Sequence, residues 1–219
     1  MSIETGRFAL QAHGACVVRY GDTVIMATIV QSKNIREGID YFPLMVDFEE
    51  KLYAAGRIKG SRFIKREGRP TDEAILSGRL IDRTIRPLFD ERVRNDVQVV
   101  ITSLCVDGEN DATITGLIAA SCAIHMSSVP WAGPIGAARI GRVSGELVLN
   151  ITAEKLSRGT TRDPDFTSGE KNESDLDLIV AGTPDKLIMV EAGAKEVSED
   201  DMYSAIKWGC EQLQPVIDL

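Results

Sequence analysis

Apolar and polar positions alternate over the first part of the chain in the manner of β-strands. Residues 15–20 and 23–30 are rich in β-branched side chains, and the Gly21-Asp22 pair between them is a typical two-residue hairpin turn. The alternation stops at 54–70, where three glycines and a proline predict a loop. The pattern therefore predicts a hairpin that is followed by an irregular segment.

Helical signals follow this loop. Thr71 precedes two acidic residues and an apolar run, so we expect it to cap a helix that continues to about Ile85, where an Arg-Pro pair stops it. Residues 111–126 are rich in Ala, Ile and Leu and predict a buried helix. Ser198 is expected to cap a last amphipathic helix that ends near Val216.

The remaining pattern predicts more strands. The expected strands are 42–48, 97–106, the hairpin 135–143 with 146–150, and the pair 176–181 and 186–191. The almost continuous apolar run at 97–106 is typical of a strand covered on both faces. Residues 153–174 are polar and predict a long loop. The order ββ, β, loop, α, β, α, ββ, ββ, α predicts a mixed α/β (α+β) fold of sheets packed with helices, in one domain without an internal linker.

Charge is distributed unevenly along the chain. Residues 57–94 carry 11 Lys and Arg against 6 Asp and Glu, a net of +5, whereas the rest carries 14 against 27, a net of −13. The basic residues concentrate at 57–69, where six cations and one acid surround a Phe-Ile pair. Local charge selects partners, so this segment predicts a surface for phosphate or nucleic acid, with a solvated loop as the alternative.

A second basic feature lies on the predicted helix. Spacings of four and three place Arg79, Arg83 and Arg86 on one face, and we expect Asp82 to lie off that face. Arginine suits two-point contact with phosphate oxygens, although an ion-pair stripe is the alternative. Because one short helix joins the two basic features, both can face one groove, which favours nucleic-acid binding over either alternative.

Several other classes of protein are not indicated. No apolar stretch reaches the roughly 18–20 residues that span a bilayer, and the first residues do not read as a signal peptide. The cysteines form no C-x-x-C pair, so we expect buried, reduced thiols in a cytosolic protein and no zinc site. They are Cys16, Cys105, Cys122 and Cys210.

No catalytic set is visible. Asp47, Glu49 and Glu50 are clustered, but a strand sends successive residues to opposite faces, so the three do not converge as one set. Asp175 and Asp177 share a strand face and are the local candidates for a metal, with structural acids as the favoured interpretation. The sequence contains no Walker A, G-x-S-x-G or H-E-x-x-H motif.

A series of motifs, in order and along nearly the whole chain, resembles the polynucleotide phosphorylase family. The motifs are ETGR, RYGDTV, YFPL, DFEEKLYAAGRI, KREGRP, RLIDR, IRPLF, GPIGAAR, VLN, LDLIVAGT and MVEAGA. The resemblance is to the first of that family's two ribonuclease PH-like core domains, so it implies a ribonuclease PH-like fold over 1–219. It also implies that the second core, KH and S1 domains of the family are absent here, as in a fragment.

The resemblance implies a function in mRNA degradation. The family is a phosphorolytic 3′→5′ exoribonuclease and polyribonucleotide nucleotidyltransferase that uses inorganic phosphate as co-substrate and releases nucleoside diphosphates. It is a cytoplasmic homotrimer that threads single-stranded RNA, with degradosome components among its partners and no membrane association. Its Mg²⁺ and its catalytic residues belong to the second core, so we expect no catalytic residue, metal or cofactor in this segment, which guides RNA and builds the ring.

The resemblance also implies the RNA-binding residues. The family loop carries two aromatic residues and two arginines, which match Phe63, Ile64, Lys65 and Arg66, so the second aromatic ring and one guanidinium are replaced here. The resemblance extends the RNA path to four further positions: Arg69, Arg79, Arg83 and Arg86. Two alternatives stay open: a non-catalytic RNA-binding ring subunit of an exosome-like assembly, and a free-standing ribonuclease PH-like enzyme.

Overall fold

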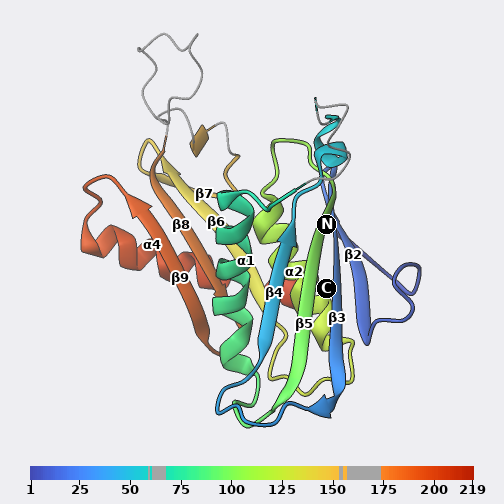
Figure 1. Cartoon of the computed structure of the whole chain (residues 1–219). Coiled ribbons are helices and arrows are strands. Elements are labelled where there is room, and N and C mark those ends of the chain that lie inside the picture. The colour runs from blue at the N-terminus through green and yellow to red at the C-terminus, as the bar shows by residue number, and fades with distance from the viewer. Residues whose placement is uncertain (59, 61–67, 153–154, 157–173) are drawn as a thin grey trace. The chain divides into compact units, whose positions relative to one another are not determined.

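The computed structural model describes residues 1–58, 60, 68–152, 155–156 and 174–219. The chain divides into two compact units (Figure 1). Unit 1 comprises Met1–Asp107 and Ala112–Ile135, and unit 2 comprises Gly108–Asp111 and Gly136–Leu219. Both units combine a sheet with helices, which confirms the predicted mixed α/β class.

Unit 1 is built on a five-stranded sheet in the order β1-β2-β3-β5-β4. Its elements are β1 (Ser2–Thr5), β2 (Gly14–Tyr20), β3 (Thr23–Ile35), β4 (Leu44–Glu49), η1 (Leu52–Ala55), α1 (Asp72–Ile85), η2 (Arg86–Leu88), β5 (Asn95–Cys105) and α2 (Ala112–His125). β2 and β3 form the predicted hairpin, in which Tyr20 faces Thr23 across the turn. Only β4 runs parallel to its neighbour, β5, and the chain between them contains α1. The short edge strand β1 was not predicted, because four mostly polar residues give no periodic signal.

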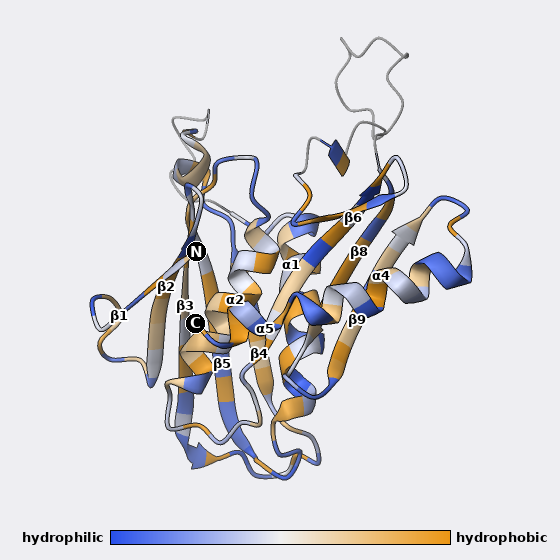
Figure 2. Ribbon diagram, turned by 180° about the vertical axis from the view of Figure 1, so that it is seen from behind, coloured by the Kyte–Doolittle hydropathy of each residue, from blue (hydrophilic) through white to orange (hydrophobic). Residues whose placement is uncertain are grey.

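Two helices bury the core of unit 1. α2 is apolar over most of its surface, and ten of its 14 residues are buried (Figure 2). A side chain at Gly14 would place its Cβ 2.1 Å from the carbonyl oxygen of Ala123, so β2 and α2 pack closer than any larger residue allows. Alternate residues of β3 point toward this core, and Ile25, Ala27 and Ile29 are fully buried. The hydrophobic effect of this burial is the main force that holds α2 to the sheet.

The opposite face of the sheet is only partly covered. Along β5, Val97, Val99 and Ile101 are buried, whereas Gln98 is exposed and Val100 is partly exposed. The prediction that this strand is covered on both faces is therefore wrong for its first half. The apolar run misled because β-branched residues are also favoured on a half-exposed pleated surface.

Unit 2 is built on a four-stranded antiparallel sheet in the order β7-β6-β8-β9. Its elements are β6 (Gly136–Val143), β7 (Glu146–Leu149), β8 (Ser174–Gly182), β9 (Leu187–Ala194), α4 (Glu199–Glu211) and α5 (Gln214–Ile217). Both predicted hairpins of this region are confirmed, and Ser144 and Gly145 adopt positive φ angles of 52° and 86° in the first. α4 packs on β8 through a core that includes Ile140, Leu178 and Ala205.

The last helix differs from its prediction. Ser198 caps α4 as expected, since its side chain accepts a hydrogen bond from the backbone N–H of Asp201. The acidic first turn of α4 is coloured blue in Figure 2. The helix ends at Glu211, however, and Pro215 lies in the separate short helix α5. Proline has no N–H and its ring clashes with the carbonyl four residues earlier, so one helix cannot run through to Val216.

No helix in the described part of the chain is long and apolar enough to cross a membrane.

The cysteines differ partly from their prediction. Cys16 is buried and Cys122 and Cys210 are partly buried, but Cys105 is exposed at the last position of β5. A hydrogen bond with Cys122 and burial both raise the pKa of the Cys16 thiol. The prediction of buried thiols is therefore wrong for Cys105.

Candidate nucleic-acid interface

Four of the eight residues predicted to bind RNA lie within the described part of the chain. Arg69 precedes α1, Arg79 and Arg83 lie on α1, and Arg86 follows its last turn. The other four are outside the described residues: Phe63, Ile64, Lys65 and Arg66. The candidate interface is therefore described through α1 and the elements that surround it.

The start of α1 is fixed by a hydrogen-bonded cap. Thr71 Oγ1 accepts a hydrogen bond from the backbone N–H of Ala74 at 3.0 Å and donates one to Glu50 Oε2 at 2.6 Å. Asp72 and Glu73 follow in the first turn, where negative charge is favourable. The predicted cap is confirmed, and its second bond ties the start of α1 to the end of β4.

α1 lies against the edge strand β4. A side chain at Gly78 would place its Cβ 3.3 Å from the carbonyl oxygen of Val46, which shows how closely the helix and the strand approach. At Gly116 of α2, a Cβ would lie 3.0 Å from both Ile101 and Phe48. The hydroxyls of Ser77 and Thr113 are 2.8 Å apart and join the two helices. These contacts fix the direction in which the polar side of α1 points.

A groove of about 440 Å³ runs between α1 and β4. Arg79, Asp82 and Arg86 line it from the helix, and Leu44 to Glu49 line it from the strand. Arg79 is exposed, and so is Arg83 in the last turn. The groove therefore has two of the three arginines of the predicted stripe on one side, and Arg83 is not among its lining residues.

Asp82 belongs to the same stripe, contrary to the prediction that it lies off the arginine face. It is three residues after Arg79 and four before Arg86, and both spacings bring side chains together on a helix. Arg86 Nε donates to Asp82 Oδ2 at 3.0 Å and Nη2 donates to Oδ1 at 2.5 Å. The prediction considered Asp82 but assigned it to the wrong side of the helix.

Arg86 also ties α1 to β4. Its Nη1 donates to the carbonyl oxygen of Phe42 at 3.3 Å, and its Nη2 donates to that of Leu44 at 3.1 Å. The side chain is 40% exposed. Arg86 therefore has a structural role at the edge of the sheet, and its contact with RNA stays a prediction, like those of Arg69, Arg79 and Arg83.

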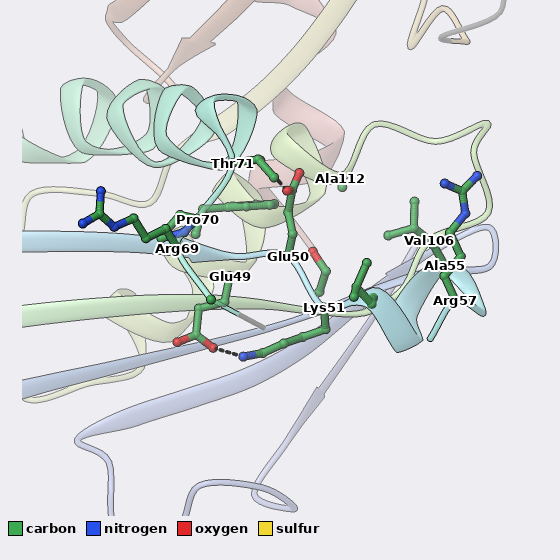
Figure 3. Close-up of a pocket in the computed structure, with 14 residues that line it drawn as sticks. Glu49, Glu50, Lys51, Ala55, Arg57, Arg69, Pro70, Thr71, Val106 and Ala112 are labelled. Atoms are coloured by element: carbon green, nitrogen blue, oxygen red, sulfur yellow. Dashed lines mark hydrogen bonds and ion pairs between the residues drawn. The ribbon is translucent and has the colours of Figure 1, made fainter. Parts of the chain in front are cut away.

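A second cavity, of about 540 Å³, adjoins the groove, and we call it the β4 pocket (Figure 3). Phe48, Glu49 and Pro70 line both cavities. Lys51 Nζ lies 2.9 Å from Glu49 Oε2, and Arg57 and Arg69 lie at opposite ends of the residues drawn in Figure 3. The structure thus brings Arg69 close to the groove of Arg79 and Arg86 through the lining residues that the two cavities share.

The two acids considered as metal ligands are each bound by an arginine in unit 2. Arg142 Nε and Nη2 donate to the two oxygens of Asp175 at 2.9 and 2.7 Å. Arg139 Nε and Nη2 donate to those of Asp177 at 2.8 and 2.7 Å. Both carboxylates are therefore neutralised within the chain, which supports the structural interpretation. No group of three or more His, Cys, Asp or Glu side chains suited to a metal occurs among the described residues.

Each of these arginines also forms an ion pair with a second carboxylate. Arg139 Nη1 lies 2.5 Å from Asp111 Oδ2, and Arg142 Nη1 lies 2.8 Å from Asp201 Oδ2. Hydrogen bonds from Arg142 lower the pKa of Asp175. The pKa of Asp201 is also lowered, mainly by its hydrogen bond with Ser198 and next by its hydrogen bond with Arg142. Sequence reasoning missed both arginines. The signal was a pair of cations in the otherwise apolar strand β6, opposite two acids in β8.

Comparison with known proteins agrees with this fold. Residues 1–130 match domain 1 of the 3′ exoribonuclease family (RNase PH), and residues 133–212 match domain 2 of the same family.

The chain belongs to the 3′ exoribonuclease family.

Family relatives extend the match to nearly every residue. The chain is 52% identical over 217 residues to polyribonucleotide nucleotidyltransferase of Heliobacterium modesticaldum. This match covers 99% of the chain and 28% of that relative. It is 49% identical over 218 residues to the protein of the same name from a Bradyrhizobium species, again over 28% of the relative. The chain thus spans little more than a quarter of the length of these relatives.

Solved structures of low sequence identity share the fold. Rice Rrp46 superposes with a TM-score of 0.73 at 15% identity, over 99% of this chain and 91% of that one. A chain of the Archaeoglobus fulgidus exosome, solved with RNA bound to the active site, superposes with a TM-score of 0.71 at 16% identity, over 98% and 86%. The ribonuclease PH-like fold is therefore confirmed for this member of the 3′ exoribonuclease family.

Proposed function

We propose that this chain is the first ribonuclease PH-like core domain of a polyribonucleotide nucleotidyltransferase. The observation that carries the proposal is the 52% identity that extends over 99% of the chain and over 28% of the relative. The whole protein then degrades mRNA from the 3′ end: a phosphate oxygen attacks the last phosphodiester, a nucleoside diphosphate leaves, and the shortened RNA retains a 3′ hydroxyl. This segment guides single-stranded RNA toward that reaction.

The geometry of unit 1 supports an RNA-guiding role. The exposed cations Arg69, Arg79 and Arg83 lie on or just before α1, and the neighbouring groove is accessible to solvent. Contacts of this kind bind the phosphate backbone and read little sequence. We expect Lys65, Arg66 and Arg69 to supply much of the attraction, since they are three of the six cations in residues 57–69.

We propose that the chemical step takes place outside this segment. Asp175 and Asp177, the two candidate metal ligands, do not fit a Mg²⁺ site, because each gives both carboxylate oxygens to an arginine. We propose that Mg²⁺ and the phosphate co-substrate bind the second core domain of a cytoplasmic homotrimer, which also carries KH and S1 domains and contacts degradosome components. This chain then contributes to the ring and to the RNA path.

A second candidate is a non-catalytic RNA-binding ring subunit, which is compatible with the fold that this chain shares with the exosome-like structures. Their likeness to this chain is at 15–16% identity and shows the fold alone. Identity near 50% to polyribonucleotide nucleotidyltransferases therefore favours the first candidate. A free-standing phosphorolytic enzyme is disfavoured, because Asp175 and Asp177, which were its metal candidates, are each bound by an arginine.

RNA binding is tested by changing Lys65, Arg66 and Arg69 together to Ala. Affinity for oligo(A) should fall, and the negative slope of log K against log salt should become shallower by about 2, because each neutralised phosphate of a single strand contributes about −0.7 to that slope. Arg19→Ala/Arg36→Ala/Arg92→Ala is the matched control, because it removes three exposed arginines that pair with neighbouring acids. An unchanged slope in the first variant would refute the proposed role of these cations.

Catalysis is tested separately with poly(A) and inorganic phosphate. The chain alone should release no ADP, because the proposed catalytic core is a different domain. Phosphate-dependent release of ADP by the purified 219-residue chain would contradict the assignment of chemistry to the second core.

A further inference from the structure

One buried hydroxyl among the described residues of unit 1 makes no hydrogen bond. Ser103 lies on β5, is 1% exposed, and its Oγ has no hydrogen-bond partner in the part of the chain that the structure describes. It is the one side-chain oxygen or nitrogen there in this condition. A buried polar atom without a partner is unfavourable, so such an atom calls for an explanation.

This serine lines the β4 pocket. The walls beside it are largely apolar and come from Phe48, Leu52, Pro70 and Val106. A volume of about 540 Å³ lies within the range of roughly 300–1,000 Å³ that small-molecule sites occupy. Apolar walls with one hydrogen-bonding group suit a flat, mainly apolar ligand part that carries a polar edge.

Charged groups stand at the rim of the same pocket. Arg57 is exposed and lines it, while the amine of Lys51 is engaged by Glu49 at 2.9 Å (Figure 3). Glu50 receives a hydrogen bond from Thr71 through Oε2, and its side chain also lines the pocket. An arginine binds phosphate oxygens well, and a carboxylate oxygen accepts hydrogen bonds from sugar hydroxyls.

We propose that the β4 pocket is a nucleotide subsite. The base lies between the apolar walls with its polar edge on Ser103 Oγ, the ribose hydroxyls approach Glu50, and the phosphate lies on Arg57. The choice of a nucleotide rests on the RNA-directed function proposed above, because the same chemistry reaches the pocket as one unit of an RNA strand or as a free nucleoside monophosphate. A base held in this pocket would anchor RNA that passes along the neighbouring groove.

The first experiment measures AMP binding to the 219-residue chain by calorimetry, with Ser103→Ala as the test variant. Removal of the hydrogen bond should weaken AMP binding about fivefold or more. The melting temperature of this variant should stay equal or rise, because Ala removes an unsatisfied buried group. Ser121→Ala is the matched control: Ser121 Oγ is also buried but accepts a hydrogen bond from the backbone N–H of Ile135 at 2.8 Å, so that variant should melt lower.

The second variant tests the rim. Arg57→Ala should weaken AMP more than adenosine, since only AMP carries the phosphate. Arg92→Ala should leave both ligands unaffected, because Arg92 is paired with Asp90 and does not line the pocket. Equal AMP affinity in the wild-type, Ser103→Ala and Arg57→Ala proteins, or no AMP binding to any of them at millimolar concentration with no effect of Ser103→Ala on oligo(A), would overturn the proposal.

Oligo(A) distinguishes the source of the nucleotide and separates this proposal from the proposed function. If Ser103→Ala weakens oligo(A) and AMP alike, the pocket holds a unit of the RNA. If it weakens AMP alone, the pocket is a site for a free nucleotide. If oligo(A) binds with the expected salt dependence and Ser103→Ala changes neither ligand, the subsite is wrong and the RNA function stands. If AMP binds through Ser103 and oligo(A) does not bind, the subsite stands and the RNA function fails.

Discussion

Replacement of Arg86 by Ala should destabilise unit 1 by removing the connection between α1 and the edge strand β4. The guanidinium donates two hydrogen bonds to Asp82 and one each to the carbonyl oxygens of Phe42 and Leu44. Ala keeps the helix backbone intact, because alanine is the best helix former. The expected loss of stability therefore reports these four bonds and the small apolar contact of the side chain.

The magnitude follows from the exposure of the partners. Hydrogen bonds to charged groups contribute about 1.5–3 kcal/mol when buried, but here Arg86 is 40% and Asp82 26% exposed, so solvent screens the pair. We assign about 1 kcal/mol to the ion pair and about 0.5 kcal/mol to each carbonyl bond. The total is about 2 kcal/mol, and Arg86→Lys should lose about half of it, because an ammonium cannot reproduce the planar two-point contact.

Urea unfolding with tryptophan fluorescence measures this loss of stability. Trp131 is a local probe, since its Nε1 donates to the carbonyl oxygen of Ile85 at 3.3 Å and its ring lies 6.1 Å from that of Phe89. With a slope of about 2 kcal/mol per M, the midpoint should fall by about 1 M in Arg86→Ala. Arg79→Ala, in the same groove but exposed, should leave the midpoint within about 0.3 M. Equal midpoints for Arg86→Ala and wild type would refute the structural role of Arg86.

Two further predictions concern packing and pH. Gly14→Ala should lower the free energy of unfolding by about 3 kcal/mol in a urea titration, because its Cβ would lie 2.1 Å from a backbone oxygen of α2. Gly193→Ala is the control and should be near neutral, because a Cβ at Gly193 would have no atom within 4 Å. The pKa values of Asp175 and Asp201 are lowered in the folded state, so their stabilisation is complete above the unfolded value of about 4 and is lost as pH falls below it. An acid titration followed at Trp208 should show this loss in unit 2, and Asp175→Asn/Asp201→Asn should flatten it; a titration that is identical in the variant would contradict the assignment.

The sequence by itself determined the local elements. Thr71 and Ser198 cap helices where expected, and the two-residue turns at Gly21-Asp22 and Ser144-Gly145 close the predicted hairpins. These signals work because the side chain or the backbone freedom of one or two residues satisfies a nearby backbone requirement. The motifs then indicated the family, and the comparisons confirmed it.

Only the tertiary structure decided which side chains meet across the chain. Arg139 and Arg142 reach Asp177 and Asp175 because β6 and β8 pair, and no local pattern encodes that pairing. Arg86 reaches two carbonyl groups more than 40 residues away because β4 forms an open edge beside α1. The β4 pocket with its unpartnered serine likewise arises where β4, β5 and the start of α1 converge. Contacts of this range depend on the register of strands and the packing of helices, which the spacing of residues along the chain does not specify.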